Sequence, residues 1–252
     1  MYQFFTEPSG IEGRQISITG SDYNHIKNVL RLKKGEEVSV IVQGQDREYR
    51  CMIEDFDEKT ETVRLGLLFV KEENVELGGR IFLFQGMPKG DKLELIIQKA
   101  VELGAFEIIP VDMKRSVVKL DEKKRQKRTE RYNAISEAAA KQAKRRIVPE
   151  VKAVMSFKQA LEYCDEMGIE KRLLPYELCD PSTMKKTREI LSSIRPTEQI
   201  AVFIGPEGGF SEEEIALSEK SGFSQITLGR RILRTETAGM TVLSWLVYLL
   251  EE

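Results

Sequence analysis

The N-terminal part of the chain consists of short segments in which apolar and polar side chains alternate. Four such segments, several of them rich in β-branched residues, lie at 14–19, 36–43, 47–56 and 62–70. They are typical of β-strands, and glycine-containing turns separate one from the next. One short helix is expected at 21–32, where Ile26, Val29 and Leu30 share a face. The pattern predicts a small β-barrel or sandwich with one helix.

The pattern changes at residue 80, where strands begin to alternate with helices. Strands are expected at 80–86, 106–111, 171–177, 199–205 and 224–229, and helices at 89–104, 123–145, 156–168, 182–194, 211–222 and 235–252. This alternation favours an α/β fold with a mostly parallel sheet, whose ligands bind at the carboxyl ends of its strands. We expect a β-barrel domain over 1–72, a linker over 73–79 and an α/β domain over 80–252.

A glycine-rich loop, "FIGPEGGFSEEEI" at 203–215, follows one of these strands. Its glycines permit a tight turn and the close approach of a ligand. Ser211 and Glu214 have the spacing of a helix-capping box. The loop lacks the lysine of a phosphate-binding loop and the spacing of a dinucleotide site. It is either an ordinary strand-to-helix turn or one wall of a site for a ligand without phosphate.

A second loop, "LGRRILRTETAG" at 228–239, also leaves a strand at its carboxyl end. Its arginines surround the apolar pair Ile232 and Leu233. One interpretation is a solvated basic loop. The other is a loop whose backbone lines a pocket while its arginines extend outward.

Composition narrows the choice of chemistry. The 252 residues carry a net charge of −2, so a polyanionic partner must be met by a local basic patch. The three cysteines form no CxxC pair, and the single histidine, His25, excludes a histidine-cluster metal site and argues against a Ser/His triad. We therefore expect no metal. The apolar run 240–250 is too short to cross a bilayer and the N-terminus lacks the features of a signal peptide, so a cytoplasmic location is expected.

The two loops together resemble the RsmE-type methyltransferases of the SPOUT superfamily, which methylate N3 of a uridine in 16S ribosomal RNA. The segments "HIKNVLRLKKGEEV", "KGDKLELIIQKAVELGAFEIIPV" and "KQAKRRIVP" resemble further parts of that family. The resemblance implies a PUA-like RNA-binding barrel followed by a SPOUT domain with a C-terminal trefoil knot. It also implies S-adenosyl-L-methionine as cofactor, 16S rRNA of the small ribosomal subunit as partner, and a homodimer.

Carrying the family's cofactor pocket onto matching positions implies a set of residues from three strand ends. They are Leu174, Pro175, Tyr176, Ile204, Gly205, Pro206, Glu207, Gly208, Leu228, Gly229, Ile232 and Leu233. This cofactor has no phosphate, so glycines and apolar residues suit it better than lysines do.

Catalysis in such a site depends mostly on position, because the sulfonium of the cofactor is already a good leaving group. The uridine imide is only weakly acidic. A cation that stabilises the imide anion helps more than a strong base would. Arg234 is the first candidate for this cation and Arg231 the second. Glu207 is expected either to orient a ribose hydroxyl or the base, or only to hold the turn.

Basic residues cluster on and around the helix expected at 123–145, either as a solvated face or as a phosphate-contacting patch. The RNA-binding candidates are Arg31, Lys33, Arg115, Arg145 and Arg146. Gln3 stands where relatives often have an arginine, which weakens the expectation of an RNA contact there. The alternatives to this function are another SPOUT enzyme, such as a tRNA ribose 2'-O-methyltransferase, and a non-catalytic RNA-binding protein of ribosome assembly.

Overall fold

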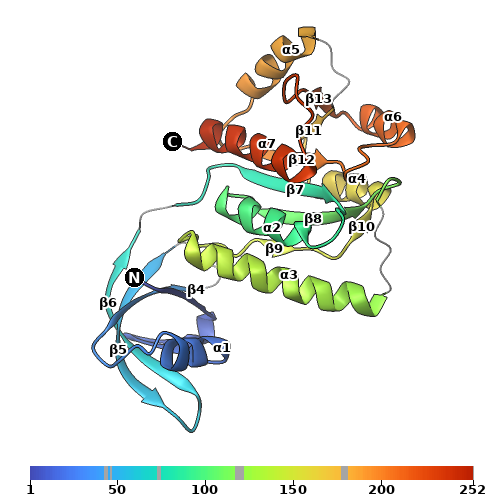
Figure 1. Ribbon diagram of the computed structural model, residues 1–252. Helices are drawn as coiled ribbons and strands as arrows, with labels where there is room; N and C mark the ends of the chain where they lie inside the picture. Colours follow the sequence, from blue (N-terminus) through green and yellow to red (C-terminus); the bar gives the residue numbers. More distant parts are fainter. Residues whose placement is uncertain (43–44, 46, 73–74, 117–121, 177–180, 252) are drawn as a thin grey trace. The chain divides into compact units, whose positions relative to one another are not determined.

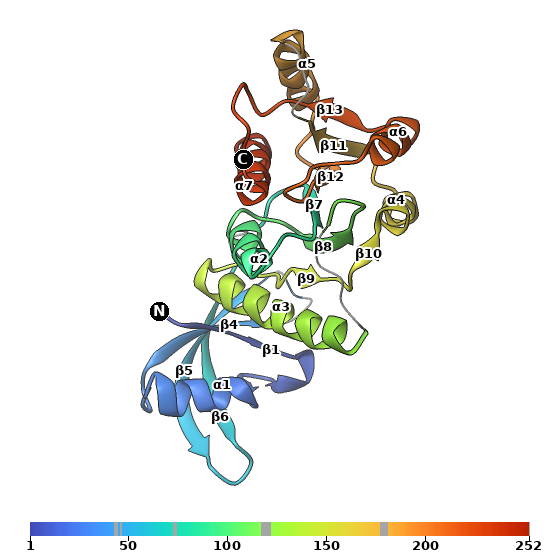
Figure 2. The same cartoon turned by 45° about the vertical axis from the view of Figure 1, so that its right-hand side comes forward.

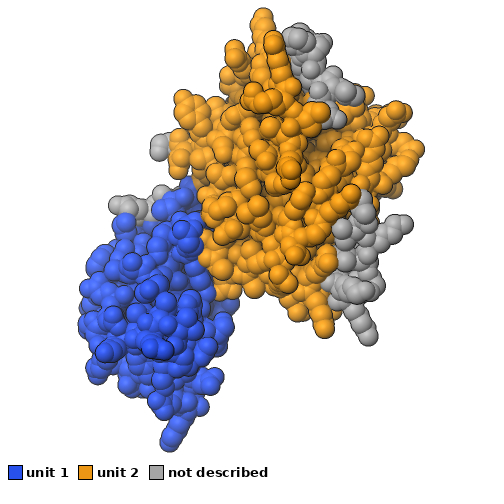
Figure 3. Space-filling model, viewed as in Figure 1, with its two compact units in different colours: residues 1–76, 140–147 blue, residues 77–139, 148–252 orange. Residues whose placement is uncertain are grey.

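The chain forms two compact units. The computed structural model describes all residues except 43, 44, 46, 73, 74, 117–121, 177–180 and 252, and only the backbone of 122–125 and 181–183. One unit comprises Met1–Glu76 with Ala140–Ile147, and the other comprises Leu77–Ala139 with Val148–Glu252 (Figure 3). The sequence-based boundaries at 72 and 80 stay a prediction. The short segment 140–147, which we had expected in the α/β domain, packs with the N-terminal unit.

The N-terminal unit is a curled six-stranded sheet with the order β1-β4-β5-β6-β3-β2 (Figure 1). Its strands are β1 (Gln3–Thr6), β2 (Ile11–Glu12), β3 (Gln15–Ile18), β4 (Glu37–Val42), β5 (Glu48–Asp57) and β6 (Thr62–Lys71). Its helices are η1 (Pro8–Gly10), α1 (Ser21–Asn24) and η2 (His25–Val29). The expected helix at 21–32 is therefore present as α1 continued by a π-helical turn. Strand β1 was missed, because its four residues show no alternation.

The C-terminal unit is a parallel sheet with the order β10-β8-β7-β12-β11-β13, with β9 paired to β8 (Figures 1 and 2). Its strands are β7 (Arg80–Gly86), β8 (Glu107–Asp112), β9 (Glu150–Val151), β10 (Met155–Ser156), β11 (Lys171–Pro175), β12 (Gln199–Ile204) and β13 (Ser224–Ile226). Its helices are α2 (Lys92–Glu102), α3 (Glu122–Gln142), α4 (Phe157–Glu166), α5 (Pro181–Ser192), α6 (Glu212–Lys220) and α7 (Thr235–Leu250). The expected α/β class is confirmed. The trefoil knot stays a prediction, since strand order does not define how the chain threads.

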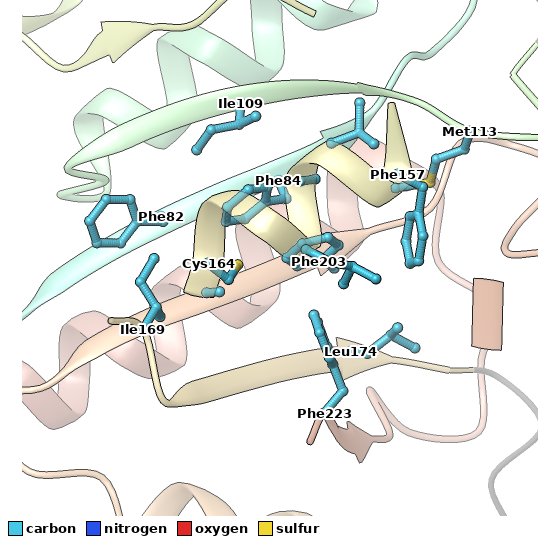
Figure 4. Packing of buried hydrophobic residues seen from close by; sticks show 14 of the residues in the cluster. Phe82, Phe84, Ile109, Met113, Phe157, Cys164, Ile169, Leu174, Phe203 and Phe223 are labelled. Carbon is cyan, nitrogen blue, oxygen red and sulfur yellow. The ribbon is translucent and has the colours of Figure 1, made fainter. Parts of the chain in front are cut away.

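The two faces of this sheet are covered by different helices. Side chains of successive strand residues point to opposite faces, so Phe84 and Phe203 lie on one face, where their rings stack with centroids 4.2 Å apart (Figure 4). Phe157 of α4 packs edge-on against Phe203 in the same core. Gln85 and Ile204 lie on the other face, where α7 contacts β7 and β12 and lies beside α2.

The helix predicted to run to Arg145 ends at Gln142 instead. Lys144 has a φ of 61°, and the backbone N–H of Arg145 donates to the carbonyl of Ala140 at 3.0 Å. The N–H of Lys144 bonds to the carbonyl of Lys141, which completes a Schellman motif with a lysine in the left-handed position that glycine usually takes. Arg145 and Arg146 consequently lie beyond the helix rather than on its basic face.

Candidate functional site

Three strand ends meet at one edge of the C-terminal sheet. Strand β11 pairs in parallel with both β12 and β13, with Leu173 opposite Val202 and Pro175 opposite Ile226. Because parallel strands end at the same edge, the segments that follow β11, β12 and β13 emerge side by side. The structure thus brings together the three segments that the sequence assigned to a cofactor pocket.

The segment after β12, residues 205–209, is a tight turn that we call the glycine turn. The N–H of Gly209 donates to the carbonyl of Pro206 at 2.8 Å, and Gly209 has a φ of 66°. A Cβ on Gly205 would lie 3.2 Å from the Cα of Gly209, and one on Gly208 would lie 2.9 Å from the Cβ of Arg115. The turn therefore requires glycines for its own packing, whatever ligand it meets.

A buried hydroxyl connects the glycine turn to the start of α7. Thr235 donates through Oγ1 to the carbonyl of Gly205 at 2.6 Å and accepts a 2.8 Å hydrogen bond from Nε2 of Gln85. Nε2 of Gln85 also donates to the carbonyl of Gly86, while its Oε1 is buried without a partner in the described residues. This connection between β7, β12 and α7 was not expected from the sequence. The one hint was a glutamine inside the apolar run "RIFLFQG".

Glu207 points toward α2 and is already hydrogen-bonded. Its carboxylate accepts from the N–H of Lys89 at 3.1 and 3.3 Å and from Nζ of Lys92 at 2.9 Å. Burial alone raises the pKa of Glu207, but the hydrogen bonds from Lys92 and the backbone outweigh it and lower the pKa below its usual value. The lowered pKa makes this carboxylate a weak base, so it is a poor proton acceptor for uridine. Its expected role in orienting ribose or base stays a hypothesis, while its role in holding the turn is visible.

Arg115 lies against the glycine turn. Its Nη1 donates to the carbonyl of Gly208 at 2.9 Å. In the preceding residue, the N–H of Lys114 donates to Oε1 of Glu214 at 2.8 Å. The loop after β8 is thus attached to the glycine turn and to α6. RNA contact by Arg115 stays a prediction, but Nη1 of its guanidinium already donates to the glycine turn.

The segment 228–234, which we call the arginine loop, is open to solvent at its centre. Ile232 is 83% exposed, and Arg230, Arg231 and Arg234 are also exposed. Gly229 has a φ of 102°, a conformation that favours glycine. Arg234 lies directly before the first residue of α7, where it is the N-cap. The two catalytic candidates, Arg231 and Arg234, therefore follow the end of β13 and have solvent-exposed side chains.

The side chains of several predicted cofactor residues face the core. Leu174 is fully buried and Ile204 is 2% exposed, so only their backbone atoms can meet a ligand. The N–H of Tyr176 is used by the carbonyl of Ile226 at 2.9 Å. The pocket at this edge must therefore be formed largely by backbone.

The open groups of the arginine loop fit an adenosine without phosphate. Within the described residues, the N–H groups of Leu228, Ile232 and Leu233 donate no hydrogen bond to the protein. An adenine edge needs backbone donors and acceptors of this kind. The acidic Glu207 and the lack of a lysine in the glycine turn also suit a ligand without phosphate. These residues fit S-adenosylmethionine.

Two of the predicted RNA contacts, Arg145 and Arg146, lie in the interior and not on the surface. Arg145 and Arg146 are each 5% exposed, because the segment 140–147 packs into the N-terminal unit. Nε of Arg145 donates to Glu76 at 3.0 Å, and its carbonyl accepts from Gln3 at 2.6 Å. The position of Gln3 is thus an interior one. Arg31 and Lys33 are exposed and remain candidates.

Other chemistries find little support in the described part of the chain. Burial raises the pKa of the thiols of Cys51 and Cys164 to about 12, so neither is a ready nucleophile. Cys179 lies outside the described residues. Among those described, no group of three or more His, Cys, Asp or Glu side chains is placed to hold a metal ion. None of the described helices combines the length and apolar character that a membrane span needs.

Comparison with known proteins agrees with this geometry. Residues 75–247 match a family described as an RNA methyltransferase domain, and 18–66 match an RNA methyltransferase PUA domain. Ribosomal RNA small subunit methyltransferase E of Bacillus subtilis is 39% identical over 94% of this chain and 91% of its own length. The enzyme of that name from Neisseria gonorrhoeae, solved with S-adenosyl methionine, is 29% identical with a TM-score of 0.80 over 97% of this chain and 96% of its own. A Legionella pneumophila methyltransferase with bound cofactor is 30% identical with a TM-score of 0.81 over 96% and 95%.

Proposed function

Because this chain belongs to the RsmE-type family of RNA methyltransferases, we propose that it transfers a methyl group from S-adenosyl-L-methionine to N3 of a uridine in 16S ribosomal RNA of the small ribosomal subunit. The observation that carries the proposal is the meeting of the β11, β12 and β13 ends beneath a loop with open backbone amides. Acting on ribosomal RNA, the enzyme works in the cytoplasm.

The cofactor supplies a methyl group on a sulfonium, which is already a good leaving group. The open amides of Leu228, Ile232 and Leu233 would hold its adenine. Gly205 and Gly229 let the backbone come close to the cofactor, and the side chain of Leu174 is buried in the core. The protein therefore binds through backbone shape rather than through charge.

The exposed guanidinium of Arg234 is the best-placed cation for the uridine imide, with Arg231 second. Arg234 is the last residue of the arginine loop and directly precedes the first turn of α7. It is also near Lys92: the hydrogen bond to Glu207 raises the pKa of Lys92, and the charge of Arg234 opposes that rise without cancelling it. A fixed cation at this place stabilises the anion that forms when N3 loses its proton.

We expect Arg234→Ala to lower kcat about 10²-fold or more while S-adenosylmethionine binds with unchanged affinity, since one preorganised charge at a transition state is worth that much. Calorimetric titration gives the affinity and a radiolabelled methyl assay gives the rate. Arg230→Ala, an exposed arginine of the same loop, is the control and should retain nearly full activity. An Arg234→Ala enzyme that methylates at the wild-type rate would refute this role.

The function itself is tested with small ribosomal subunits from a strain that lacks the modification. Incubation with labelled cofactor, followed by mass spectrometry of RNA fragments, should find one methyl group on N3 of one uridine. Label on tRNA ribose alone would favour another SPOUT enzyme. Failure to bind the cofactor at all would favour a non-catalytic ribosome-assembly protein.

We further propose that exposed cations outside the cofactor site bind the RNA backbone. In the N-terminal unit these are Arg31 and Lys33; on α3 Lys127 is exposed, whereas the side chains of 123–125 lie outside those described. Phosphate contacts release counterions, so affinity should fall steeply as salt rises. A flat salt dependence of RNA binding would contradict this part of the proposal.

A homodimer is also proposed, with α7 at the interface. Tyr248 is 85% exposed on this apolar helix, whose buried residues include Val242 and Leu246. Light scattering coupled to gel filtration should give twice the chain mass for the wild type and the monomer mass for Tyr248→Glu. A monomeric wild-type protein would exclude the dimer.

A further inference from the structure

Lys92 lies between two acidic residues of the candidate site, one in the glycine turn and one in the first turn of α7. It is the first residue of α2, and its Nζ lies 2.9 Å from Oε1 of Glu207 and 3.7 Å from Oε2 of Glu236. Glu207 belongs to the glycine turn, and Glu236 to the first turn of α7. One ammonium group thus faces two segments that come from distant parts of the chain.

The two carboxylates depend on Lys92 to different degrees. Glu207 also receives the N–H of Lys89 on both of its oxygens, so it retains a partner if Lys92 is lost. Oε2 of Glu236 is buried and has no hydrogen-bond partner in the described residues, and its side chain is 16% exposed. The ammonium of Lys92 is therefore its compensating charge. A buried carboxylate without such a charge is strongly disfavoured.

We propose that Lys92 is a positioning residue for methyl transfer, whose ammonium holds the first turn of α7, and Arg234 with it, in place against the glycine turn. The inference rests on the proposed function and deepens it. Arg234 is two residues before Glu236, so a shift of Glu236 toward solvent carries the guanidinium with it. Displacement of a catalytic group by about 1 Å lowers a rate about 10²-fold.

Lys92 acts through other residues rather than on the substrate. Its ammonium is engaged by Glu207 and Glu236, and its side chain is 33% exposed. The hydrogen bond from Lys92 to Glu207 raises the pKa of Lys92, which keeps the ammonium charged near neutral pH. Neutral lysine is thus not on hand as a base, and the contribution of Lys92 is to geometry.

The test compares Lys92→Met with Lys99→Met. Lys99 lies on the same helix, is 35% exposed and pairs with Glu102 within that helix at 2.8 Å, so it resembles Lys92 in exposure and in having an ion pair, but its partner is not part of the site. We expect Lys92→Met to lower kcat about 10²-fold, as for a misplaced catalytic group, and to leave the KM for S-adenosylmethionine close to that of Lys99→Met. Lys92→Arg should recover most of the lost rate, because it restores the charge.

A double-mutant cycle with Glu236→Gln separates positioning from a general effect. In the Glu236→Gln background the carboxylate that needs compensation is gone, so the change Lys92→Met should lower kcat much less than it does in the wild type. Equal losses in the two backgrounds, or a kcat at the level of Lys99→Met, would overturn the proposal.

Hydrogen exchange tests the proposal independently of activity. Amides in residues 235–240 should exchange faster in Lys92→Met than in Lys99→Met, since the first turn of α7 loses its anchor. If the wild-type protein bound cofactor but methylated no RNA, the proposed function would fail while this readout still decided for or against Lys92. Unchanged exchange in 235–240 would count against Lys92.

Discussion

At the scale of single residues, Thr235 determines how the glycine turn meets α7. Thr235 is 6% exposed, and its hydroxyl donates to the carbonyl of Gly205 and accepts from Nε2 of Gln85. Gln85 is fully buried and already has one oxygen without a partner. A second unsatisfied group at this place would be costly, because the core offers no water to replace it.

Thr235→Val should therefore lower the free energy of unfolding by about 1–3 kcal/mol, the usual effect of leaving a buried hydrogen-bonding group, here the carbonyl of Gly205, without its partner. Trp245, the one tryptophan of the chain, lies on α7 and reports urea unfolding by fluorescence. Thr237→Val on the exposed side of the same helix should change stability by less than about 0.5 kcal/mol. Equal effects of the two substitutions would show that the hydroxyl of Thr235 contributes nothing.

Glu207 makes the stability of the site depend on pH. Its pKa in the folded protein is below the ordinary value of 4.5, so the ionised carboxylate stabilises the fold above that pH, and this contribution is lost as pH falls below it. The wild type should be more stable than Glu207→Gln at pH 7, and the difference should shrink below pH 4.5. Glu213→Gln, in an exposed pair with Lys114, is the control and should show little difference at any pH. A gap between wild type and Glu207→Gln that widens in acid would contradict the prediction.

At the scale of elements, the capping box at the start of α6 also binds the loop after β8. Ser211 and Glu214 form the capping box expected from the sequence, with the N–H of Ser211 donating to Oε2 of Glu214 at 2.7 Å. The other oxygen of Glu214 accepts from Lys114 in the loop after β8. Helix α4 has a similar box at Ser156 and Gln159. There a single oxygen, Oε1 of Gln159, accepts from both the N–H and the hydroxyl of Ser156.

Glu214→Gln should consequently destabilise the protein by about 1–3 kcal/mol, because an amide has one acceptor oxygen for two N–H donors, the buried one of Ser211 and the partly buried one of Lys114. The reverse change at the other box, Gln159→Glu, should stay within about 0.5 kcal/mol, since Ser156 is exposed. Urea unfolding of both variants measures the difference. Similar values for the two would mean that the bond to Lys114 adds no stability.

At the scale of the whole molecule, the N-terminal unit is completed by a segment from the middle of the chain. Arg145 and Glu76 form an ion pair in which the side chains are 6% and 10% exposed. Glu76 also accepts from the N–H groups of Arg146 and Ile147, at 2.8 and 3.2 Å. This carboxylate therefore fastens 140–147 to its unit.

Glu76→Ala should expose the N-terminal unit to faster hydrogen exchange, most of all in β1 and β4, because removing one partner of a buried pair costs about 3–5 kcal/mol. Exchange in β7 and β12 should stay unchanged, since they belong to the other unit. The control is Glu72→Ala, whose pair with Arg47 is 3.8 Å long and exposed. Uniformly faster exchange in both units would show that the two do not respond separately.

Much of the fold was predictable because it follows from local pattern. The alternation of strands and helices after residue 80 indicated a parallel α/β sheet, and the spacing of Ser211 and Glu214 indicated the cap of α6. The glycine-rich and arginine-rich loops indicated where the site lies, since loops after parallel strands share one edge. These features can be predicted from the sequence because each depends on residues close together in the chain.

What the sequence by itself determined is thus the fold class, the position of the two loops and the family to which they belong. The tertiary structure alone decided which partners each side chain takes. Lys92 and Glu207 are separated by 115 residues, and Gln85 and Thr235 by 150. The sequence pattern predicts that Arg145 lies on a basic helix, whereas in the structure the chain turns at Lys144 and Arg145 is buried beside Glu76. The physical reason is that water satisfies a charge or an amide as well as any protein partner does, until packing excludes the water. Packing depends on the whole chain, so local sequence does not determine the partner.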